Sequence, residues 1–211
     1  MSKKVVIIGA GGHAKVVAST LLICGYNVIG FLDDDEKKIG TKLLDIPVIG
    51  NIELLKEGNF DFSIIAIGDN SIRRKIYYLY KEYTNFVSII HPFSYVHSSV
   101  EIGEGSVIFA GVVIQPDVRI GNNVIVNTSV SIDHDCVIGD FVHLAPGVHL
   151  AGGVIVEEGA FLGIGSSVIQ YRKVGKWSIL GAGGCVIKDI PEFTIAVGVP
   201  AIPVKENKIS I

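Results

Sequence analysis

A histidine between two aspartates is the part of the sequence best suited to chemistry. Asp133-His134-Asp135 interrupts a stretch that otherwise repeats little but aliphatic residues. Transfer of an acyl group to an amine needs a base, because the attacking amine must lose a proton. An imidazole with a pKa near 6.5 can take that proton, and an adjacent carboxylate can orient the ring and stabilise the imidazolium. His134 is therefore a candidate general base, with Asp135 or Asp133 as its partner; the plainer interpretation is a solvated surface histidine.

Two further histidines, His143 and His149, follow in the same stretch. Three histidines near a carboxylate could also hold a zinc ion with a bound water, which is an alternative of a different chemical class. The spacing of these residues matches no familiar ligand pattern. We therefore expect no metal.

A glycine-rich turn near the N-terminus is the second candidate site. Residues 9–13 (Gly-Ala-Gly-Gly-His) follow an apolar run and precede an expected helix, and Asp33-Asp34 ends the next apolar run. This context is typical of nucleotide binding, because glycines let the backbone approach a ligand and a helix N-terminus attracts phosphate. A tight turn without a ligand is the plainer alternative. A dehydrogenase fits poorly, since about ninety residues hold only part of a doubly wound sheet, so we expect one nucleotide, such as that of a nucleotide-sugar.

A six-residue repeat must position the candidate base. Every sixth residue from 96 to 186 is aliphatic. The sixteen positions are Val96, Ile102, Ile108, Ile114, Ile120, Val126, Ile132, Ile138, Leu144, Leu150, Val156, Leu162, Val168, Val174, Leu180 and Val186. This period predicts a parallel β-helix over about residues 94–190, with three hexads in a coil of 18 residues and coils about 4.8 Å apart.

Within a hexad we expect the aliphatic residue to point inward. His134, two residues after Ile132, should then lie at a corner of the coil and point outward. Glycine often follows the aliphatic directly, as in Ile138-Gly139. We expect such glycines to relieve corners where φ is positive.

The first ninety residues alternate strands and helices instead. Apolar runs predict strands over 4–8, 27–32 and 60–68, and helices are expected over 14–25, ending at Gly25, and over 71–83, capped by Ser71. This order predicts a small Rossmann-like parallel α/β sheet. We therefore expect two domains, residues 1–90 and residues 91–211, joined by a short link around residues 91–92.

Composition narrows the class of protein. The net charge of −3 gives no indication of a nucleic-acid or membrane partner, and the uncharged apolar stretch at residues 16–32 is short for a membrane span and contains polar residues. The N-terminus carries no secretory signal pattern. The three cysteines match no zinc or disulfide pattern. We expect a cytoplasmic protein with reduced thiols.

Several motifs together resemble one known family over nearly the whole chain. These are GAGGHAKVV, FLDDD, IIAIGDNSIRRK, the IxHPxxxV segment, HDCVIGDFVHLAPG and GVPA. They are similar to the bacterial sugar O- and N-acyltransferases with hexapeptide repeats, which include UDP-4-amino-sugar N-acetyltransferases of the bacillosamine type and sialic acid O-acetyltransferase-like proteins. The resemblance implies a left-handed β-helix, a homotrimer with sites between subunits, and acetyl-CoA as co-substrate.

The resemblance also implies roles for individual residues. His134 would be the base and Asp135 its partner. The substrate-binding set would be Gly11, Gly12 and His13 on the sugar-phosphate side, Asp33 and Asp34 on the uracil or ribose side, and Gly68. The acetyl-CoA-binding set would be Asn127, His143, Ile164 and Ala182. In that set His143 would donate a hydrogen bond that polarises the thioester carbonyl.

These observations predict an acetyl-CoA-dependent N-acetyltransferase. Its expected acceptor is the amino group of a UDP-linked amino sugar, of the UDP-4-amino-4,6-dideoxy type, for bacterial surface glycan or glycoprotein synthesis. An O-acetyltransferase of sialic acid or a related sugar is the alternative, although a nucleotide domain makes little sense for a free sialic acid. A structural trimer that only binds nucleotide-sugar is the non-enzymatic alternative, for which the Asp-His-Asp sequence would have no use.

Overall fold

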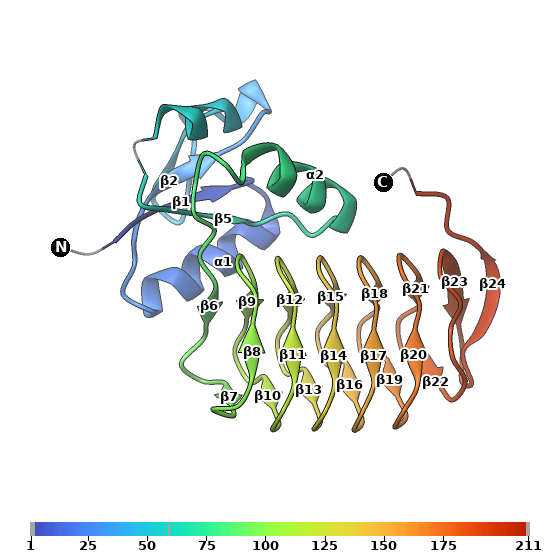
Figure 1. Cartoon of the computed structure of the whole chain (residues 1–211). Coiled ribbons are helices and arrows are strands. Elements are labelled where there is room, and N and C mark those ends of the chain that lie inside the picture. Colours follow the sequence, from blue (N-terminus) through green and yellow to red (C-terminus); the bar gives the residue numbers. More distant parts are fainter. Residues whose placement is uncertain (1–2, 59, 210–211) are drawn as a thin grey trace.

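The N-terminal part is a small α/β sheet, as the alternation predicted (Figure 1). The structure, a computed structural model, describes residues 3–58 and 60–209. The elements are β1 (Lys4–Ile8), α1 (Gly12–Ile23), β2 (Asn27–Leu32), the 3-10 turn η1 (Glu36–Lys38), β3 (Lys42–Leu43), β4 (Ile46–Gly50), the 3-10 turn η2 (Ile52–Glu57), β5 (Phe62–Ile65) and α2 (Asn70–Tyr80). The strand order is β3-β4-β2-β1-β5, and all neighbours are parallel except the β3–β4 pair at the edge.

The expected boundaries differ from the structure at both helices and at β5. Helix α1 spans Gly12–Ile23, so it begins and ends two residues before the predicted 14 and 25, and α2 spans Asn70–Tyr80 rather than 71–83. The cap is Asp69 rather than Ser71, because the Asp69 carboxylate accepts hydrogen bonds from the backbone N–H groups of Ser71 and Ile72. Strand β5 ends at Ile65, short of the predicted residue 68, and the last three residues of that run form a loop that borders a pocket. Gly25 follows α1 with φ of 79°, the left-handed conformation expected after a helix.

The C-terminal part is a left-handed parallel β-helix with one two-residue strand per hexad. Three sheets form its sides. The first sheet contains β6 (Ile89–Ile90), β9 (Val107–Ile108), β12 (Ile125–Val126), β15 (His143–Leu144), β18 (Phe161–Leu162), β21 (Ile179–Leu180), β23 (Thr194–Val197) and β24 (Ile202–Glu206). The second sheet contains β7 (Tyr95–Val96), β10 (Val113–Ile114), β13 (Ser131–Ile132), β16 (His149–Leu150), β19 (Ser167–Val168) and β22 (Cys185–Val186). The third sheet contains β8 (Glu101–Ile102), β11 (Arg119–Ile120), β14 (Val137–Ile138), β17 (Ile155–Val156) and β20 (Lys173–Val174).

Each coil therefore has three corners, which we number in chain order. The first corner joins the first and second sheets, the second corner joins the second and third sheets, and the third corner leads back to the first sheet of the next coil. Neighbouring strands pair in a register of 18 residues, as in Ser131 with His149. The second corner is consequently opposite the first sheet in every coil.

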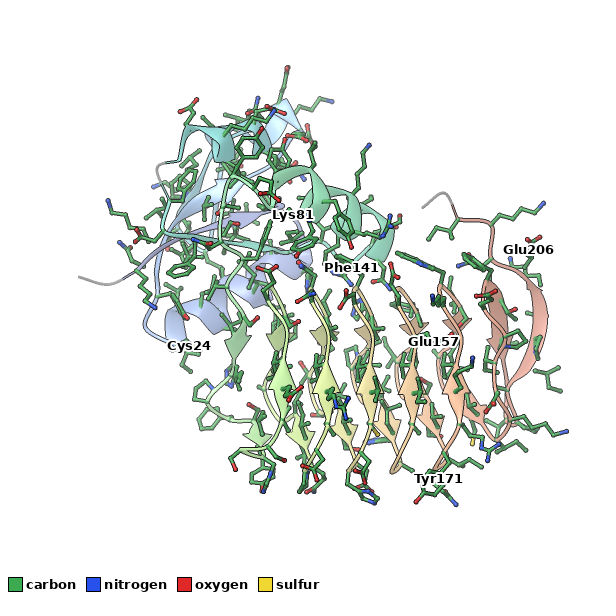
Figure 2. All side chains as sticks on the ribbon, viewed as in Figure 1. Cys24, Lys81, Phe141, Glu157, Tyr171 and Glu206 are labelled. Atoms are coloured by element: carbon green, nitrogen blue, oxygen red, sulfur yellow. The ribbon has the colours of Figure 1, made fainter. Side chains whose placement is uncertain are left out.

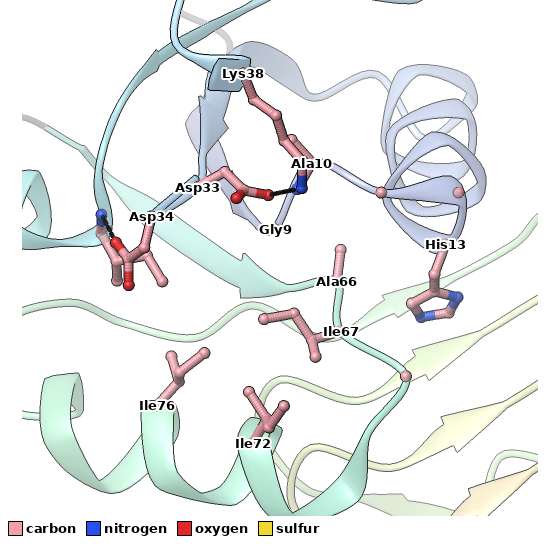
Figure 3. Close-up of a pocket in the computed structure, with 14 residues that line it drawn as sticks. Gly9, Ala10, His13, Asp33, Asp34, Lys38, Ala66, Ile67, Ile72 and Ile76 are labelled. Carbon is pink, nitrogen blue, oxygen red and sulfur yellow. Dashed lines mark hydrogen bonds and ion pairs between the residues drawn. The ribbon is translucent and has the colours of Figure 1, made fainter. Parts of the chain in front are cut away.

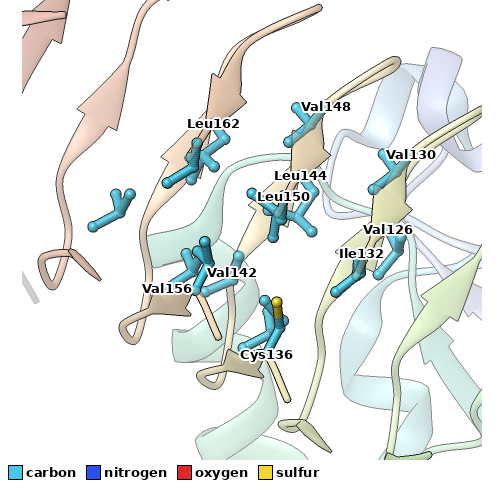
Figure 4. Close-up of a cluster of buried hydrophobic side chains, with 14 of the residues drawn as sticks. Val126, Val130, Ile132, Cys136, Val142, Leu144, Val148, Leu150, Val156 and Leu162 are labelled. Atoms are coloured by element: carbon cyan, nitrogen blue, oxygen red, sulfur yellow. The ribbon is translucent and has the colours of Figure 1, made fainter. Parts of the chain in front are cut away.

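The predicted aliphatic column is the core of the β-helix (Figure 4). Fourteen of its sixteen positions, from Ile108 to Val186, are buried, and the residues two places earlier, such as Val130 and Cys136, fill the same interior. Val96 and Ile102 are partly buried against it. The column starts one hexad earlier than predicted, at Ile90 in β6, which is exposed because it lies in the first strand of its sheet.

The expectation about corner glycines was wrong. Positive φ occurs three residues after the column aliphatic in every hexad from residue 105 to residue 183, and half of these residues are not glycine, for example Asp135 with φ of 60°. The glycine directly after the aliphatic serves close packing between coils. A Cβ on Gly121 or Gly139 would lie 2.7 Å from the backbone nitrogen of Asp140 or Glu158 in the next coil. No side chain fits there.

The α/β part packs on the first sheet of the β-helix. Helix α1 lies beside β6 and β9, and α2 lies over the ends of the coils that contain β12, β15 and β18 (Figure 1). Ala14 and Val17 of α1 share a buried cluster with Phe109 and Ile125, and Tyr77 of α2 packs against Phe141 at a third corner, with ring centroids 5.6 Å apart. The domain division at residues 90 and 91 stays a prediction, and β6 already pairs with β9 before that point.

The last described strands close the C-terminal end of the first sheet. Strand β23 pairs in parallel with β21, and β24 then returns antiparallel along β23. In the described part of the chain, neither helix is long and apolar enough to cross a membrane.

Candidate active site

His134 lies at a second corner and points outward, as its place in the hexad predicted. Its side chain is 52% exposed, and its Nδ1 lies 2.7 Å from Oδ2 of Asp135. A carboxylate oxygen accepts, so the Nδ1–H of His134 donates to it, and the Nε2 lone pair is left to take a proton. Asp133 is bound differently, because its Oδ1 accepts the backbone N–H of His134. Of the two carboxylates flanking the histidine, Asp135 is therefore the one that orients the ring.

Electrostatics make this imidazole a stronger base. The hydrogen bond to Asp135 raises the pKa of His134 above its ordinary value; loss of solvation opposes this shift, and the charges of Asp133 and Asp135 add to it. Both ring and carboxylate are solvent-exposed. The arrangement can take a proton from a substrate that approaches the corner from outside.

The ring of His134 lies over a glycine that sequence reasoning missed. A Cβ at position 152 would be 2.6 Å from Cε1 of His134, so a larger residue there would displace the imidazole. Gly153 makes the same room for the ring of Tyr171, with a Cβ distance of 2.5 Å. The available signal was the 18-residue period, which places Gly152 at the same corner as His134 in the next coil.

The predicted substrate residues line one pocket in the α/β part (Figure 3). The pocket has a volume of about 390 Å³. Its lining residues are Gly9, Ala10, Gly11, Gly12, His13, Asp33, Asp34, Lys38, Ile52, Ala66, Ile67, Gly68, Ile72 and Ile76. Asp34 lies at one end and His13, in the first turn of α1, at the other, with Gly9 and Ala10 between them (Figure 3). All six predicted substrate-binding residues are thus brought together.

The two aspartates of the pocket differ in the hydrogen bonds that they accept from the protein. Asp33 accepts hydrogen bonds from the backbone N–H groups of Ala10 and Asp35 and from Nζ of Lys38. Burial would raise the pKa of the Asp33 carboxyl, but the hydrogen bonds from Lys38, Asp35 and Ala10 outweigh it and hold the pKa below its usual range. Asp34 accepts the backbone N–H of Ile52 on Oδ1. Its Oδ2 is the oxygen better placed to receive donors of a ligand.

His13 lines the other end of the pocket, and His143 lies next to it, between the α/β part and the first sheet. The ring centroids of His13 and His143 are 6.3 Å apart, and the Nδ1 of His143 lies 3.3 Å from the carbonyl oxygen of Gly68. Burial and the nearby Arg73 charge lower the pKa of His13 to about 4 and that of His143 to about 3. Both rings are therefore neutral at physiological pH.

The predicted acetyl-CoA residues lie along the first corner and the edge of the first sheet beside it. Asn127, Ile164 and Ala182 belong to the first corners of three coils, and Ile164 is 62% exposed. Asn127 directly follows β12, and its Nδ2 lies 3.5 Å from Nε2 of His143. A second cavity of about 380 Å³, lined in part by Gly68, Phe161 and Asn207, opens on the same sheet.

Within one chain the candidate base is not brought to the pocket. His134 stands at the second corner, opposite the first sheet against which the pocket and His143 lie. Figure 2 shows this separation, with Tyr171 of a second corner at the far end of the coils from Phe141 and Lys81. Within residues 3–58 and 60–209, no group of three or more His, Cys, Asp or Glu residues could hold a metal ion.

Comparison with known families identifies the α/β part. Residues 4–79 match the family described as the PglD N-terminal domain. A curated relative, GDP-perosamine N-acetyltransferase of Escherichia coli O157:H7, is 31% identical over 97% of this chain and 98% of its own length. The chain spans less than half the length of other curated relatives that it matches, 43% of one and 24% of another.

Solved structures extend the likeness to the whole fold. PerB of Caulobacter crescentus, solved in complex with CoA and GDP-perosamine, is 42% identical with a TM-score of 0.91, and the match covers 96% of this chain and 97% of that one. The acetyltransferase domain of PglB from Neisseria gonorrhoeae, solved with acetyl coenzyme A, is 38% identical with a TM-score of 0.91. That match covers 97% of this chain and 100% of the domain.

Proposed function

The chain belongs to the bacterial sugar O- and N-acyltransferases with hexapeptide repeats, and from this premise we propose that it transfers the acetyl group of acetyl-CoA to the amino group of a nucleotide-linked amino sugar. The observation that carries the proposal is the His134–Asp135 pair at a glycine-lined corner. An inert β-helix has no need of an exposed, oriented imidazole. Relatives that act on GDP-perosamine or bind acetyl coenzyme A supply the class of substrates.

The geometry at His134 suits the chemistry of acetyl transfer. The amine attacks the thioester carbonyl, the C–N bond forms, and Nε2 of His134 takes the proton that the nitrogen loses. The C–S bond then breaks, and the imidazolium returns the proton to the departing thiolate sulfur. Asp135 holds Nδ1–H and stabilises the imidazolium between these steps.

The pocket supports one orientation of the acceptor. Its base and ribose lie at the end with Asp33 and Asp34, the diphosphate lies at the N-terminus of α1 beside Gly11 and Gly12, and the sugar extends past His13 toward Gly68. The family resemblance makes a UDP-linked 4-amino-4,6-dideoxy sugar our first candidate. A GDP-linked amino sugar is the second, because two relatives named above act on or bind GDP-perosamine.

The first corner is the proposed location of acetyl-CoA. Asn127, Ile164 and Ala182 lie at this corner in different coils, and the small residues around the last two leave backbone groups open to the pantetheine amides. The donor and the base then lie on different corners of one chain. We therefore propose a homotrimer in which one subunit's second corner completes the site on its neighbour, and static light scattering of an active monomer would contradict it.

We also propose a cellular setting for the reaction. The three free thiols fit a reducing compartment, so we propose the cytoplasm, where acetyl-CoA and nucleotide-sugars are both made. The acetylated sugar would serve bacterial surface glycan or glycoprotein synthesis, as the resemblance implies.

A thiol-release assay with acetyl-CoA tests the activity. Free thiol should appear with one or a few UDP- or GDP-linked amino sugars and not with the corresponding hydroxy sugars. Release with free sialic acid would favour O-acetylation instead, and binding of nucleotide-sugar without release would favour the structural trimer.

A variant in the pocket separates the two substrates. The position of Gly11 has open space around it and faces the pocket, so Gly11→Leu should fold and fill the acceptor site. The KM for nucleotide-sugar should rise much more than the KM for acetyl-CoA. Equal increases would contradict separate sites for acceptor and donor.

A further inference from the structure

Arg73 is the largest fully buried side chain of the described residues, at 1% exposure. Its guanidinium donates to the carbonyl oxygens of Ile67, Asn123 and Phe141 at 3.0, 2.9 and 2.7 Å, and to Oδ1 of Asn70 at 2.8 Å. A buried arginine bound mainly to carbonyls is unusual, because such a charge ordinarily has a carboxylate partner. The planar fork of donors makes this side chain suited to fixing several backbone segments at once.

These acceptors belong to both parts of the molecule. Ile67 lies in the loop that follows β5 and lines the acceptor pocket, whereas Asn123 and Phe141 lie at the third corners of successive coils. Asn70 binds the third corner of the next coil, because its Nδ2 donates to the carbonyl oxygen of Gly159 at 3.0 Å, 18 residues beyond Phe141. Asn70 and Arg73 of α2 therefore connect the pocket loop by hydrogen bonds to the third corners of three successive coils.

The pocket loop in turn holds His143. Nη1 of Arg73 lies 3.3 Å from the carbonyl oxygen of Gly68, and the same oxygen lies 3.3 Å from Nδ1 of His143. A carbonyl oxygen can only accept, so Nδ1 of His143 carries the hydrogen. Burial keeps the ring neutral, and Nε2 is then an acceptor that faces Nδ2 of Asn127 at 3.5 Å. The interface around the ring contains Arg73, His13 and Phe161 as its other neighbours.

We propose that Arg73 is a positioning residue which, through the Gly68 carbonyl, holds His143 in the Nδ1–H form and so presents Nε2 as a hydrogen-bond acceptor on the donor side of the site. This rests on the proposed function for the location of the donor. It replaces the expected role of His143, because an imidazole in this form cannot donate from Nε2 to polarise a thioester carbonyl. Instead, Nε2 receives an N–H group, from Asn127 or from an amide of the pantetheine arm.

The form of His143 can be measured without any substrate. In protein labelled with ¹⁵N-histidine, the ring signals of His143 are assigned by their loss in His143→Gln. We expect one protonated ring nitrogen, Nδ1, and one unprotonated ring nitrogen, Nε2, from pH 8 to pH 5.5. A signal pattern with hydrogen on Nε2, or a charged ring in this range, would overturn the proposal.

Substitution of Arg73 tests the linkage. Arg73→Lys keeps a positive charge but loses the fork, and we expect His143 to sample both neutral forms and kcat to fall about tenfold, equivalent to about 1.4 kcal/mol. The matched control is Arg74→Lys on the same helix, whose side chain is paired with Glu158 near the surface. The control should change neither the ring signals nor kcat. Unchanged ring signals and kcat in folded Arg73→Lys would overturn the proposal.

A second variant covers the case in which Arg73→Lys does not fold. Asn70→Ala removes the amide oxygen that accepts from Nη2 and the amide that donates to Gly159, and it leaves the guanidinium in place. It should shift the His143 signals in the same direction by a smaller amount, and wild-type signals would again overturn the linkage. If no nucleotide-sugar releases thiol but the ring signals are as expected, the proposed function fails and the positioning of His143 stands.

Discussion

The second corner that carries His134 and the interface that encloses His143 put the same side chain to opposite uses. His134 is exposed, donates to a carboxylate, and has its pKa raised above the ordinary value. His143 is enclosed, donates to a backbone carbonyl, and has its pKa lowered to about 3. The two residues are nine positions apart, half of an 18-residue coil, and belong to different hexads. Their different surroundings are set by which side of the coil each hexad occupies.

The difference shows how a uniform repeat creates two kinds of site. At the second corner, the hexad offers only its own neighbours, so His134 needs a carboxylate from Asp135 beside it. On the first sheet, the α/β part covers the coil, so His143 finds a carbonyl from a distant segment. A titratable base forms where solvent reaches the repeat, and a fixed neutral acceptor forms where a second layer covers it.

The largest test of this comparison is His134→Ala. Loss of the exposed base should lower kcat by about 10²–10⁴-fold, the usual worth of a positioned general base. The side chain is outside the aliphatic column, so the thermal midpoint and the affinity for nucleotide-sugar should remain near wild type. The pH profile of kcat/KM should lose its acidic limb. Full activity with an unchanged profile would remove His134 from the mechanism.

Gly152→Ala should have the next largest effect on kcat. The added Cβ would lie 2.6 Å from Cε1 of His134, at the movable end of the side chain, so the ring should shift while the coil stays folded. Steady-state kinetics should show a fall in kcat of about tenfold or more, or about 1.4 kcal/mol. In the His134→Ala background the same change should have little further effect. An equal loss in both backgrounds would mean that Gly152 acts other than through the imidazole.

The pH dependence of stability sharpens the other side of the comparison. The folded pKa values of His13 and His143, about 4 and about 3, are below the ordinary value of 6.5, so the unfolded chain binds protons first as the pH falls. The stability contribution is complete above pH 6.5 and is lost as the pH falls toward 4 and 3. The slope should reach about 1.4 kcal/mol per pH unit for each histidine at most.

Urea unfolding at pH 7, 6 and 5 measures that slope. His143→Gln should unfold with a shallower dependence on pH, because one of the two groups no longer titrates. His134→Ala should have the opposite effect and steepen the dependence between pH 7 and pH 6, because the raised pKa of His134 lets the folded chain bind this proton before the unfolded chain does. If the pH slope of the unfolding free energy changed in His134→Ala but not in His143→Gln, the exposed histidine, and not the enclosed one, would link protonation to stability.

The smallest expected effects concern the two aspartates. Asp135→Asn replaces the charged acceptor that raises the pKa of His134 with a neutral amide, so the midpoint of the acidic limb of kcat/KM should move to lower pH, with kcat lowered by less than His134→Ala lowers it. Asp133→Asn removes only a nearby charge and should shift the limb less. A larger shift for Asp133→Asn would identify Asp133 as the true partner.

The sequence was most informative where one residue type repeats. The inward aliphatic column and the outward corner position of His134 both follow from a six-residue period. The strand–loop–helix context likewise grouped Gly11, His13 and Asp33 in one pocket. Each of these inferences depends on local spacing alone.

Contacts between distant segments could not be read in the same way. Nothing in the period indicates that Arg73 binds carbonyls of two coils, or that the Gly68 carbonyl decides which nitrogen of His143 carries the hydrogen. The short strands β3 and β4 were also missed, because β3 has only two residues and β4 contains a proline. The glycines after the aliphatic residues were assigned to corners, since close packing between coils involves residues 18 positions apart.

The antiparallel return of β24 decides where the solenoid stops. A stack of parallel strands presents an open edge at each end, to which another copy could add coil upon coil and form a fibre. On the first sheet the outermost strand at the C-terminal end is β24, which is exposed along its length and contains Pro203, Lys205 and Glu206. Proline withholds an N–H, and charged side chains resist stacking against a second strand. The last described strand of the first sheet therefore discourages end-to-end addition of a second copy along this edge.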